Sequence, residues 1–130
     1  MIYLDSCLLI YAIEDAGDRG HTARLLIEEQ EADGIAISPL VKLECLVGAL
    51  RVGDPVVRQR YEHAFSELTS VPIGDDAFVR AAGLRAEHKL TTPDALHLAV
   101  ALTSGCDALW TNDRRFSKAA ESFVRPVFAG

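Results

Sequence analysis

Four carboxylates stand at positions from which a folded chain could bring them together. Asp5 closes a short apolar run at the N-terminus, and Asp113 comes just after a later apolar run. Asp94 and Glu44 lie within the first turns of two predicted helices. Ligands of an open parallel sheet bind beyond the carboxyl ends of the strands, near the point where the strand order reverses. The pattern therefore predicts an acidic site at one end of a sheet.

Such a group of acids implies a cation. Two unit charges about 4 Å apart repel each other by about 4 kcal/mol at an effective dielectric constant near 20. A divalent ion removes this penalty, and ligands that offer only oxygen favour Mg²⁺ or Mn²⁺ over zinc. One or two such ions beside a phosphodiester can activate water and stabilise the leaving oxygen.

Each acid also has an ordinary structural interpretation. Asp94 fits a first-turn helix acid, which the helix dipole stabilises by roughly 0.3–1 kcal/mol. Asp113 fits a turn residue, and Glu44 fits a solvated helix position. Glu44 resists this interpretation because its neighbours Leu43 and Cys45 are apolar, and a carboxylate in apolar surroundings is costly without a partner.

Short apolar runs alternate with helical patterns along the chain. Three N-cap and proline pairs, Ser38-Pro39, Asp54-Pro55 and Thr92-Pro93, predict helix starts. Asp75 or Asp76 is expected to cap another helix, with Phe78, Ala81 and Leu84 facing inward, and Gly105 fits a helix C-terminus. The predicted strands are residues 2–4, 35–37, 71–73, 108–110 and 123–128.

These elements predict an α/β fold. We expect a three-layer α/β/α sandwich with a mainly parallel central sheet of about five short strands. Pro72 and Pro126 place the third and fifth runs at the sheet edges, because proline cannot donate to a central ladder. The first run is then central.

Length and composition fit one domain over residues 1–130, with 49% hydrophobic and 25% charged residues. There is no apolar run of membrane-spanning length and no signal-peptide pattern, so a cytoplasmic protein without a membrane partner is expected.

Cys7, Cys45 and Cys106 are widely spaced and fit buried free thiols. The net charge of −6 is atypical of nucleic-acid binders, but a cation bound at the acids would reverse the local charge.

Four segments of the chain together resemble the PIN-domain family, and most of all its VapC toxin branch. They are residues 2–6 (IYLDS), 38–44 (SPLVKLE), 92–99 (TPDALHLA) and 109–113 (LWTND), and they follow the family order over nearly the whole chain. Any one segment is a weak signal, whereas the four in order are a strong one.

The resemblance implies an Mg²⁺- or Mn²⁺-dependent endoribonuclease, the toxin of a type II VapBC toxin–antitoxin pair. It assigns the catalytic metal pocket to Asp5, Glu44, Asp94 and Asp113, with Ser6, Thr111 and Asn112 in support. It also implies an RNA substrate, homodimers and inhibition by a VapB-like antitoxin. The RNA target class and cut sequence are not specified.

Several further residues are candidates near these segments. Arg114 and Arg115 directly follow Asp113 and are the best candidates for RNA phosphate contacts, with Lys42 as a weaker one. Lys118 is a further candidate. Solvated surface charge is an equally good interpretation of each basic residue alone. His97 shares a helix face with Asp94, and we interpret it as a helix polar group or a support for the ligands rather than a catalytic base.

Other functions fit less well. A haloacid-dehalogenase-type phosphatase needs a second acid where this chain has Cys7. A receiver-like signalling module needs paired acids after the first strand, where this chain has Asp5-Ser6, and a lysine where it has Arg125. A non-catalytic PIN-like binding module and a DNA-directed nuclease of the same family also remain as alternatives.

Overall fold

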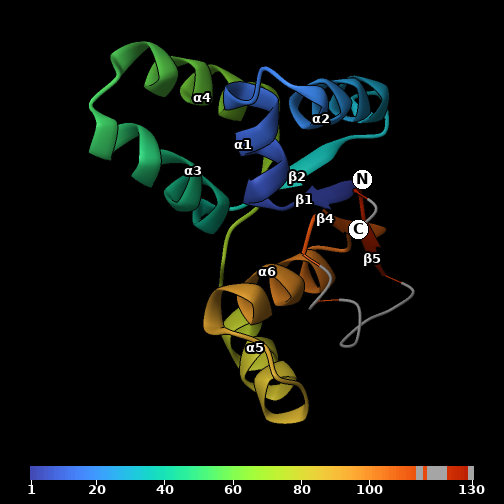
Figure 1. Cartoon of the computed structure of the whole chain (residues 1–130). Helices are drawn as coiled ribbons and strands as arrows, with labels where there is room; N and C mark the ends of the chain where they lie inside the picture. The colour runs from blue at the N-terminus through green and yellow to red at the C-terminus, as the bar shows by residue number, and fades with distance from the viewer. Residues whose placement is uncertain (114–115, 117–122, 129–130) are drawn as a thin grey trace.

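The computed structural model describes residues 1–113, 116 and 123–128, and these form a parallel sheet with helices around it (Figure 1). The strands are β1 (Ile2–Leu4), β2 (Ile35–Ile37), β3 (Thr69–Ser70), β4 (Ala108–Thr111) and β5 (Val124–Pro126). The helices are α1 (Ser6–Glu14), α2 (Asp18–Gln30), α3 (Pro39–Val52), α4 (Pro55–Glu67), α5 (Asp75–Glu87) and α6 (Thr92–Thr103).

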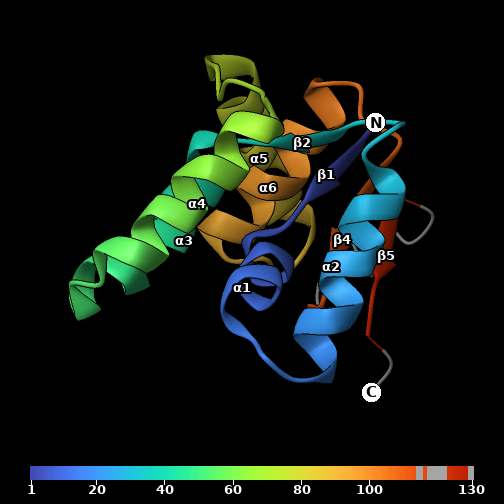
Figure 2. The same cartoon turned by 90° about the horizontal axis from the view of Figure 1, so that it is seen from above.

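The sheet has the order β3-β2-β1-β4-β5, and every pairing is parallel. Helices α1 and α2 cover one face, and α5 and α6 cover the other (Figure 1). Helices α3 and α4 lie side by side and project beyond the sheet (Figure 2). The predicted three-layer α/β architecture is confirmed, with β1 at the centre and β3 and β5 at the edges. The order differs from the 2-1-3-4-5 order of receiver domains, which removes that alternative.

The third strand and two helix caps differ from the sequence expectations. β3 ends at Ser70, before the predicted run begins, because Pro72 limits pairing beyond the bond from Val71 N to Ile37 O. The N-cap of α6 is Thr91 rather than Thr92, and its hydroxyl accepts from Asp94 N at 3.3 Å. The N-cap of α5 is Gly74 rather than an aspartate.

Helix α1 and the exposure of Phe78 were not predicted. α1 follows β1 at once, because the Asp5 side chain caps it by accepting from Ser6 N. Phe78 on α5 is 54% exposed, so the inward orientation expected for it is wrong, whereas Ala81 on the same helix is buried. The αL conformation of Gly105, with φ of 73°, confirms its place after the C-terminus of α6.

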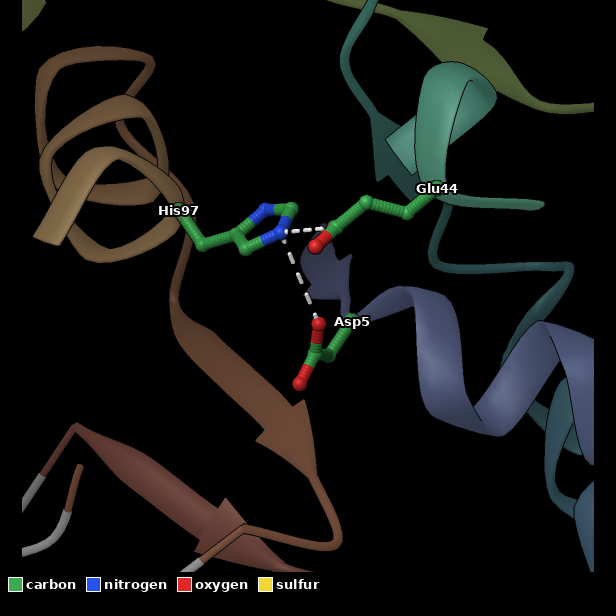
Figure 3. Close-up of side chains that lie close together, drawn as sticks. All are labelled: Asp5, Glu44 and His97. Atoms are coloured by element: carbon green, nitrogen blue, oxygen red, sulfur yellow. Dashed lines mark hydrogen bonds and ion pairs between the residues drawn. The ribbon is translucent and has the colours of Figure 1, made fainter. Parts of the chain in front are cut away.

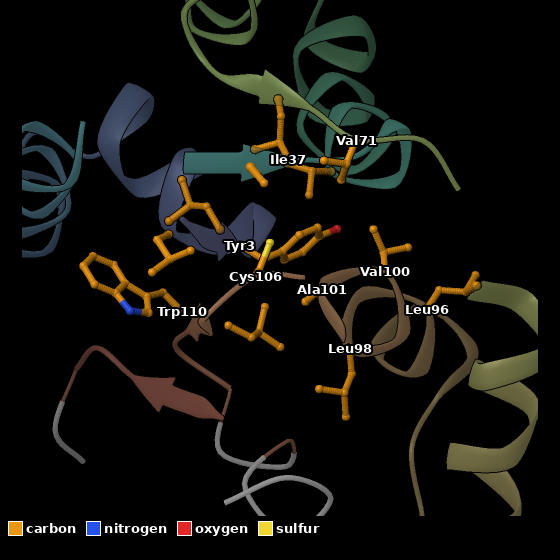
Figure 4. Close-up of a cluster of buried hydrophobic side chains, with 14 of the residues drawn as sticks. Tyr3, Ile37, Val71, Leu96, Leu98, Val100, Ala101, Cys106 and Trp110 are labelled. Atoms are coloured by element: carbon orange, nitrogen blue, oxygen red, sulfur yellow. The ribbon is translucent and has the colours of Figure 1, made fainter. Parts of the chain in front are cut away.

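The hydrophobic core lies between the sheet and the flanking helices (Figure 4). Each large side chain that it buries contributes roughly 1.5–3 kcal/mol. Tyr3 of β1 and Val100 of α6 are fully buried there, so α6 is fixed against the sheet. No helix among the described residues has the length and apolar character needed to span a bilayer.

Helix α2 approaches the C-terminal end of α1 closely at Gly20. A Cβ atom on Gly20 would lie 1.8 Å from the carbonyl oxygen of Asp15 and 2.9 Å from that of Tyr11. Both of these atoms belong to backbone and cannot move away cheaply. Gly20 therefore allows α2 to pack closely against α1, the helix that Asp5 caps.

We predict that Gly20→Ala lowers the free energy of unfolding by roughly 1–3 kcal/mol, because overpacking must displace backbone. Urea unfolding followed by circular dichroism measures this change. Gly48→Ala in the middle of α3 is the control, since a Cβ there meets nothing within 4 Å. The control should be neutral or stabilising by up to about 1 kcal/mol. Equal stability of the two variants would contradict the packing argument.

Candidate metal centre

Asp5 lies at the carboxyl end of the central strand, where the sheet order turns from β2 to β4. Its backbone N–H donates to Trp110 O at 3.0 Å and extends the pairing of β1 with β4. Oδ1 accepts from Ser6 N at 2.8 Å, and Oδ2 accepts from the Thr111 hydroxyl at 2.6 Å. The residue is only 7% exposed. These donors compensate the buried carboxylate and fix its orientation.

The end of β4 supplies the second part of the site. Thr111 is the last residue of the strand and is fully buried. Its Oγ1 accepts from Asp113 N at 2.9 Å while its hydroxyl donates to Asp5. Asn112 Nδ2 donates to the Tyr11 hydroxyl at 3.3 Å. Thr111 thus joins Asp5 to the backbone of Asp113, and its supporting role at the site stays a prediction.

Glu44 reaches the same place from α3. Its Oε1 lies 3.1 Å from Ser6 Oγ and 2.5 Å from His97 Nε2, both of which donate to it. Burial raises the pKa of Glu44, but the hydrogen bonds and charge from His97 and the bond from Ser6 outweigh it, so the pKa is below its ordinary value. Glu44 is therefore ionised at neutral pH.

His97 extends from α6 toward both carboxylates (Figure 3). Its Nε2 lies 3.7 Å from Asp5 Oδ1, beside the shorter contact to Glu44. On the other side of the ring, Nδ1 lies 2.7 Å from the Tyr3 hydroxyl, which also lies 2.7 Å from Ser38 Oγ. Burial raises the pKa of Tyr3 further above its ordinary range, so this phenol keeps its proton.

The structure thus brings Asp5 and Glu44 together with His97. One ligand atom from each lies within 4.8 Å of the others, a spacing compatible with a metal ion. Asp94 stands in the first turn of α6, three residues before His97, and this spacing puts both on one helix face. Asp113 follows β4 on the strand next to Asp5. All four predicted acids therefore belong to elements that meet at this end of the sheet.

Sequence reasoning missed three neighbours of the acids. Tyr3 was not singled out among the candidate residues, although its hydroxyl binds His97. Ser38 was assigned as a helix cap, but it makes no capping bond and contacts Tyr3 instead. Cys7 is half-buried and lies 3.5 Å from Asp5 Oδ2, and burial raises its pKa to about 12, so it stays a neutral thiol. The one sequence signal for these neighbours was position: Tyr3 and Cys7 lie two residues from Asp5, and Ser38 precedes Pro39.

The structure gives little support to the RNA contacts proposed for the basic residues. Lys42 directs its ammonium toward the ring of Phe65 on α4, with 6.0 Å to the ring centroid. Arg114, Arg115 and Lys118 lie outside the described residues. The RNA contacts of all four remain predictions.

Solved structures resemble this chain over nearly its full length. A toxin–antitoxin complex from Klebsiella pneumoniae contains a chain with 29% identity and a TM-score of 0.79, with 98% of each chain covered. VapBC2 from Rickettsia felis, bound to a promoter DNA fragment, has 22% identity and a TM-score of 0.79, with 96% of this chain and 98% of the other covered.

A third structure is VapC20 from Mycobacterium tuberculosis, described as a toxin that cleaves the sarcin–ricin loop. It has 18% identity and a TM-score of 0.74, with 92% of this chain and 95% of the other covered. The likenesses below 25% identity show a shared fold. No curated protein matched this chain.

The family comparison is more direct than these structural likenesses. The model of the PIN domain matches residues 2–122. That range contains the central strand, the helices that bear Glu44 and His97, and the strand that bears Thr111. With the family match and the matching fold, this chain belongs to the PIN-domain family.

Proposed function

We propose that this protein is a divalent-metal-dependent endoribonuclease and the toxin of a VapBC-type toxin–antitoxin pair, acting as one PIN-like domain. The observation that carries the proposal is the pairing of two carboxylates, the buried Asp5 and the partly exposed Glu44, at the carboxyl end of the central strand. Each carboxylate is held there by its own hydrogen-bond donors. The proposal is supported by membership of a family of nucleases and by the likeness to the Klebsiella toxin–antitoxin complex.

The donor set of the site fits a hard divalent cation. Asp5 and Glu44 supply carboxylate oxygens at the centre, and Asp94 and Asp113 add further acids on adjoining elements. Carboxylates are ligands of Mg²⁺ and Mn²⁺, the ions that we assign to this site. A bound divalent cation would assist attack of water on the phosphodiester and stabilise the charge on the leaving oxygen.

The residues of the chain have distinct roles in this proposal. Asp5 and Asp94 are the principal metal ligands, Glu44 is a further ligand or orients water, and Asp113 holds a second ion or acts through water. Thr111 and Ser6 hold the carboxylates by the hydrogen bonds described above. Asn112 is fixed by Tyr11 and supports the same edge.

The proposed partners follow from the toxin assignment. The Klebsiella pneumoniae relative is a toxin–antitoxin complex, and the Rickettsia felis VapBC2 structure also contains promoter DNA. We assign to this chain a VapB-like antitoxin, an RNA substrate and a homodimeric state. Exposed Leu43, Val47 and Leu50 form an apolar stripe along α3, which is consistent with association.

We predict that the wild-type protein cleaves RNA with Mg²⁺ or Mn²⁺ and not with EDTA. A panel of transfer, ribosomal and messenger RNA, analysed on sequencing gels, identifies the target class. Asp5→Asn and Asp94→Asn should abolish cleavage because each removes a charged oxygen ligand. Asp75→Asn is the matched control, since Asp75 also lies in the first turn of a helix.

Equal cleavage by the wild type and both site variants would contradict the assignment of the site. Cleavage that persists in EDTA would contradict metal dependence. A wild type that cuts no RNA in the panel while it binds Mn²⁺ would favour the non-catalytic PIN-like binding module.

Expression in a heterologous bacterium should arrest growth, because the cell would lack the matching antitoxin. Growth curves and colony counts after induction measure the effect. Asp5→Asn should relieve the arrest at the same protein level on immunoblots, and Asp75→Asn should not. Arrest of equal depth with Asp5→Asn would show that toxicity does not depend on the proposed chemistry.

A further inference from the structure

His97 is unusual in having both ring nitrogens engaged while its side chain is almost fully buried. The residue is 1% exposed. Nδ1 contacts the Tyr3 hydroxyl at 2.7 Å and Nε2 contacts Glu44 Oε1 at 2.5 Å. Tyr3 of the central strand holds one side of the ring, so the other side can hold the Glu44 carboxylate in a fixed position.

A continuous series of hydrogen bonds links the core to the site through His97. An N–H at Nε2 donates to the Glu44 carboxylate, and Nδ1 on the other side of the ring lies 2.7 Å from the Tyr3 hydroxyl. The Tyr3 hydroxyl in turn lies 2.7 Å from the Ser38 hydroxyl. These contacts join Ser38 to Glu44 by way of Tyr3 and His97.

The Ser38 side chain takes part in these hydrogen bonds and does not cap helix α3. It precedes Pro39 at the start of α3, where its hydroxyl would ordinarily accept from a backbone N–H. Its side chain makes no such bond, is fully buried and contacts Tyr3. Ser38, the residue directly before α3, is thus bonded to β1, and Glu44 on that helix is bonded to α6.

In this structure His97 Nε2 and Glu44 Oε1 are hydrogen-bonded to each other and lie closer together than two ligands of one ion would. Two ligands of one ion at 2.0–2.1 Å with octahedral geometry are about 3 Å apart or more. The Nε2–Oε1 distance is 2.5 Å, and Nε2 carries a proton in this bond. His97 therefore does not act as a ligand beside Glu44 Oε1 but as its hydrogen-bond donor.

Both donors to Glu44 meet at the same oxygen. Ser6 Oγ and His97 Nε2 donate to Oε1. Among the described residues, Oε2 makes no hydrogen bond, and it is the oxygen that remains for a cation. At metal sites, hydrogen-bonded partners orient the side chains that bind the metal. The two donors to Oε1 would orient Glu44 in this way and leave Oε2 for the cation.

We propose that His97 is a positioning residue of the metal centre, which acts through Glu44 and is itself held by the Tyr3–Ser38 pair. The inference rests on the proposed function, because it assumes that a divalent cation binds at Asp5 and Glu44. It assigns no role to His97 in contacting the substrate.

Mn²⁺ affinity tests the inference independently of cleavage. The signal of free Mn²⁺ in electron paramagnetic resonance gives the Kd for the wild type and each variant. His97→Leu should weaken binding about 10- to 100-fold, the usual effect of losing a partner of a metal ligand. His97→Gln keeps an N–H donor that can reach Glu44 and should recover most of the affinity. Tyr3→Phe should weaken binding less than His97→Leu does.

Tyr61→Phe is the matched control for Tyr3→Phe. Tyr61 is also fully buried and also donates to an acid, Glu14, but at the opposite end of α1 from Asp5. Its loss should leave the Mn²⁺ affinity unchanged. Thermal unfolding without metal checks that each variant folds. If His97→Leu does not fold, the comparison of His97→Gln and Tyr3→Phe with the wild type and Tyr61→Phe still decides the question.

Coupling to Glu44 separates positioning from other roles. In a Glu44→Gln background, His97→Leu should cause little further loss, because the group through which it acts has changed. A full additional loss there would overturn the inference, as would wild-type affinity in folded His97→Leu or an equal loss in His97→Leu and His97→Gln. A wild type that binds no Mn²⁺ would overturn the metal site itself, and the inference with it.

Discussion

The burial of the Asp5 carboxylate is the constraint around which the site is built. A carboxylate at 7% exposure must be compensated on both oxygens. Ser6 N compensates one oxygen as part of the start of α1, and the Thr111 hydroxyl compensates the other from the end of β4. The site therefore depends on the pairing of β1 with β4 and on the immediate turn into α1. Neither can move without leaving a buried charge unpaired.

The sheet order explains how distant segments converge on that point. β1 is flanked by β2 and β4: helix α3, which follows β2, carries Glu44, and β4 itself ends at Thr111. α6 crosses the opposite face and brings His97 to the same edge. The hydrogen-bonded chain through Tyr3 joins α3 and α6 across β1. The imidazole of His97 contacts both carboxylates, with Nε2 at 2.5 Å from Glu44 and 3.7 Å from Asp5.

Local signals were sufficient for the fold and for the location of the acids. Short apolar runs between helical patterns predicted the parallel sheet, and prolines correctly predicted its edges. The apolar neighbours of Glu44 correctly indicated that it has partners. Local signals failed where a distant partner competes. Ser38 has the local pattern of a cap, but Tyr3, 35 residues away in sequence, takes its hydroxyl. His97 lies on the buried face of α6, and no local pattern reveals its two partners.

The most direct test of this account is a crystal structure with Mn²⁺, in which anomalous scattering locates the ion. We expect an anomalous peak for Mn²⁺ within bonding distance of oxygens from Asp5 and Glu44, with His97 Nε2 still donating to Glu44. A peak elsewhere on the molecule, or one ligated by His97 in place of Glu44, would contradict it.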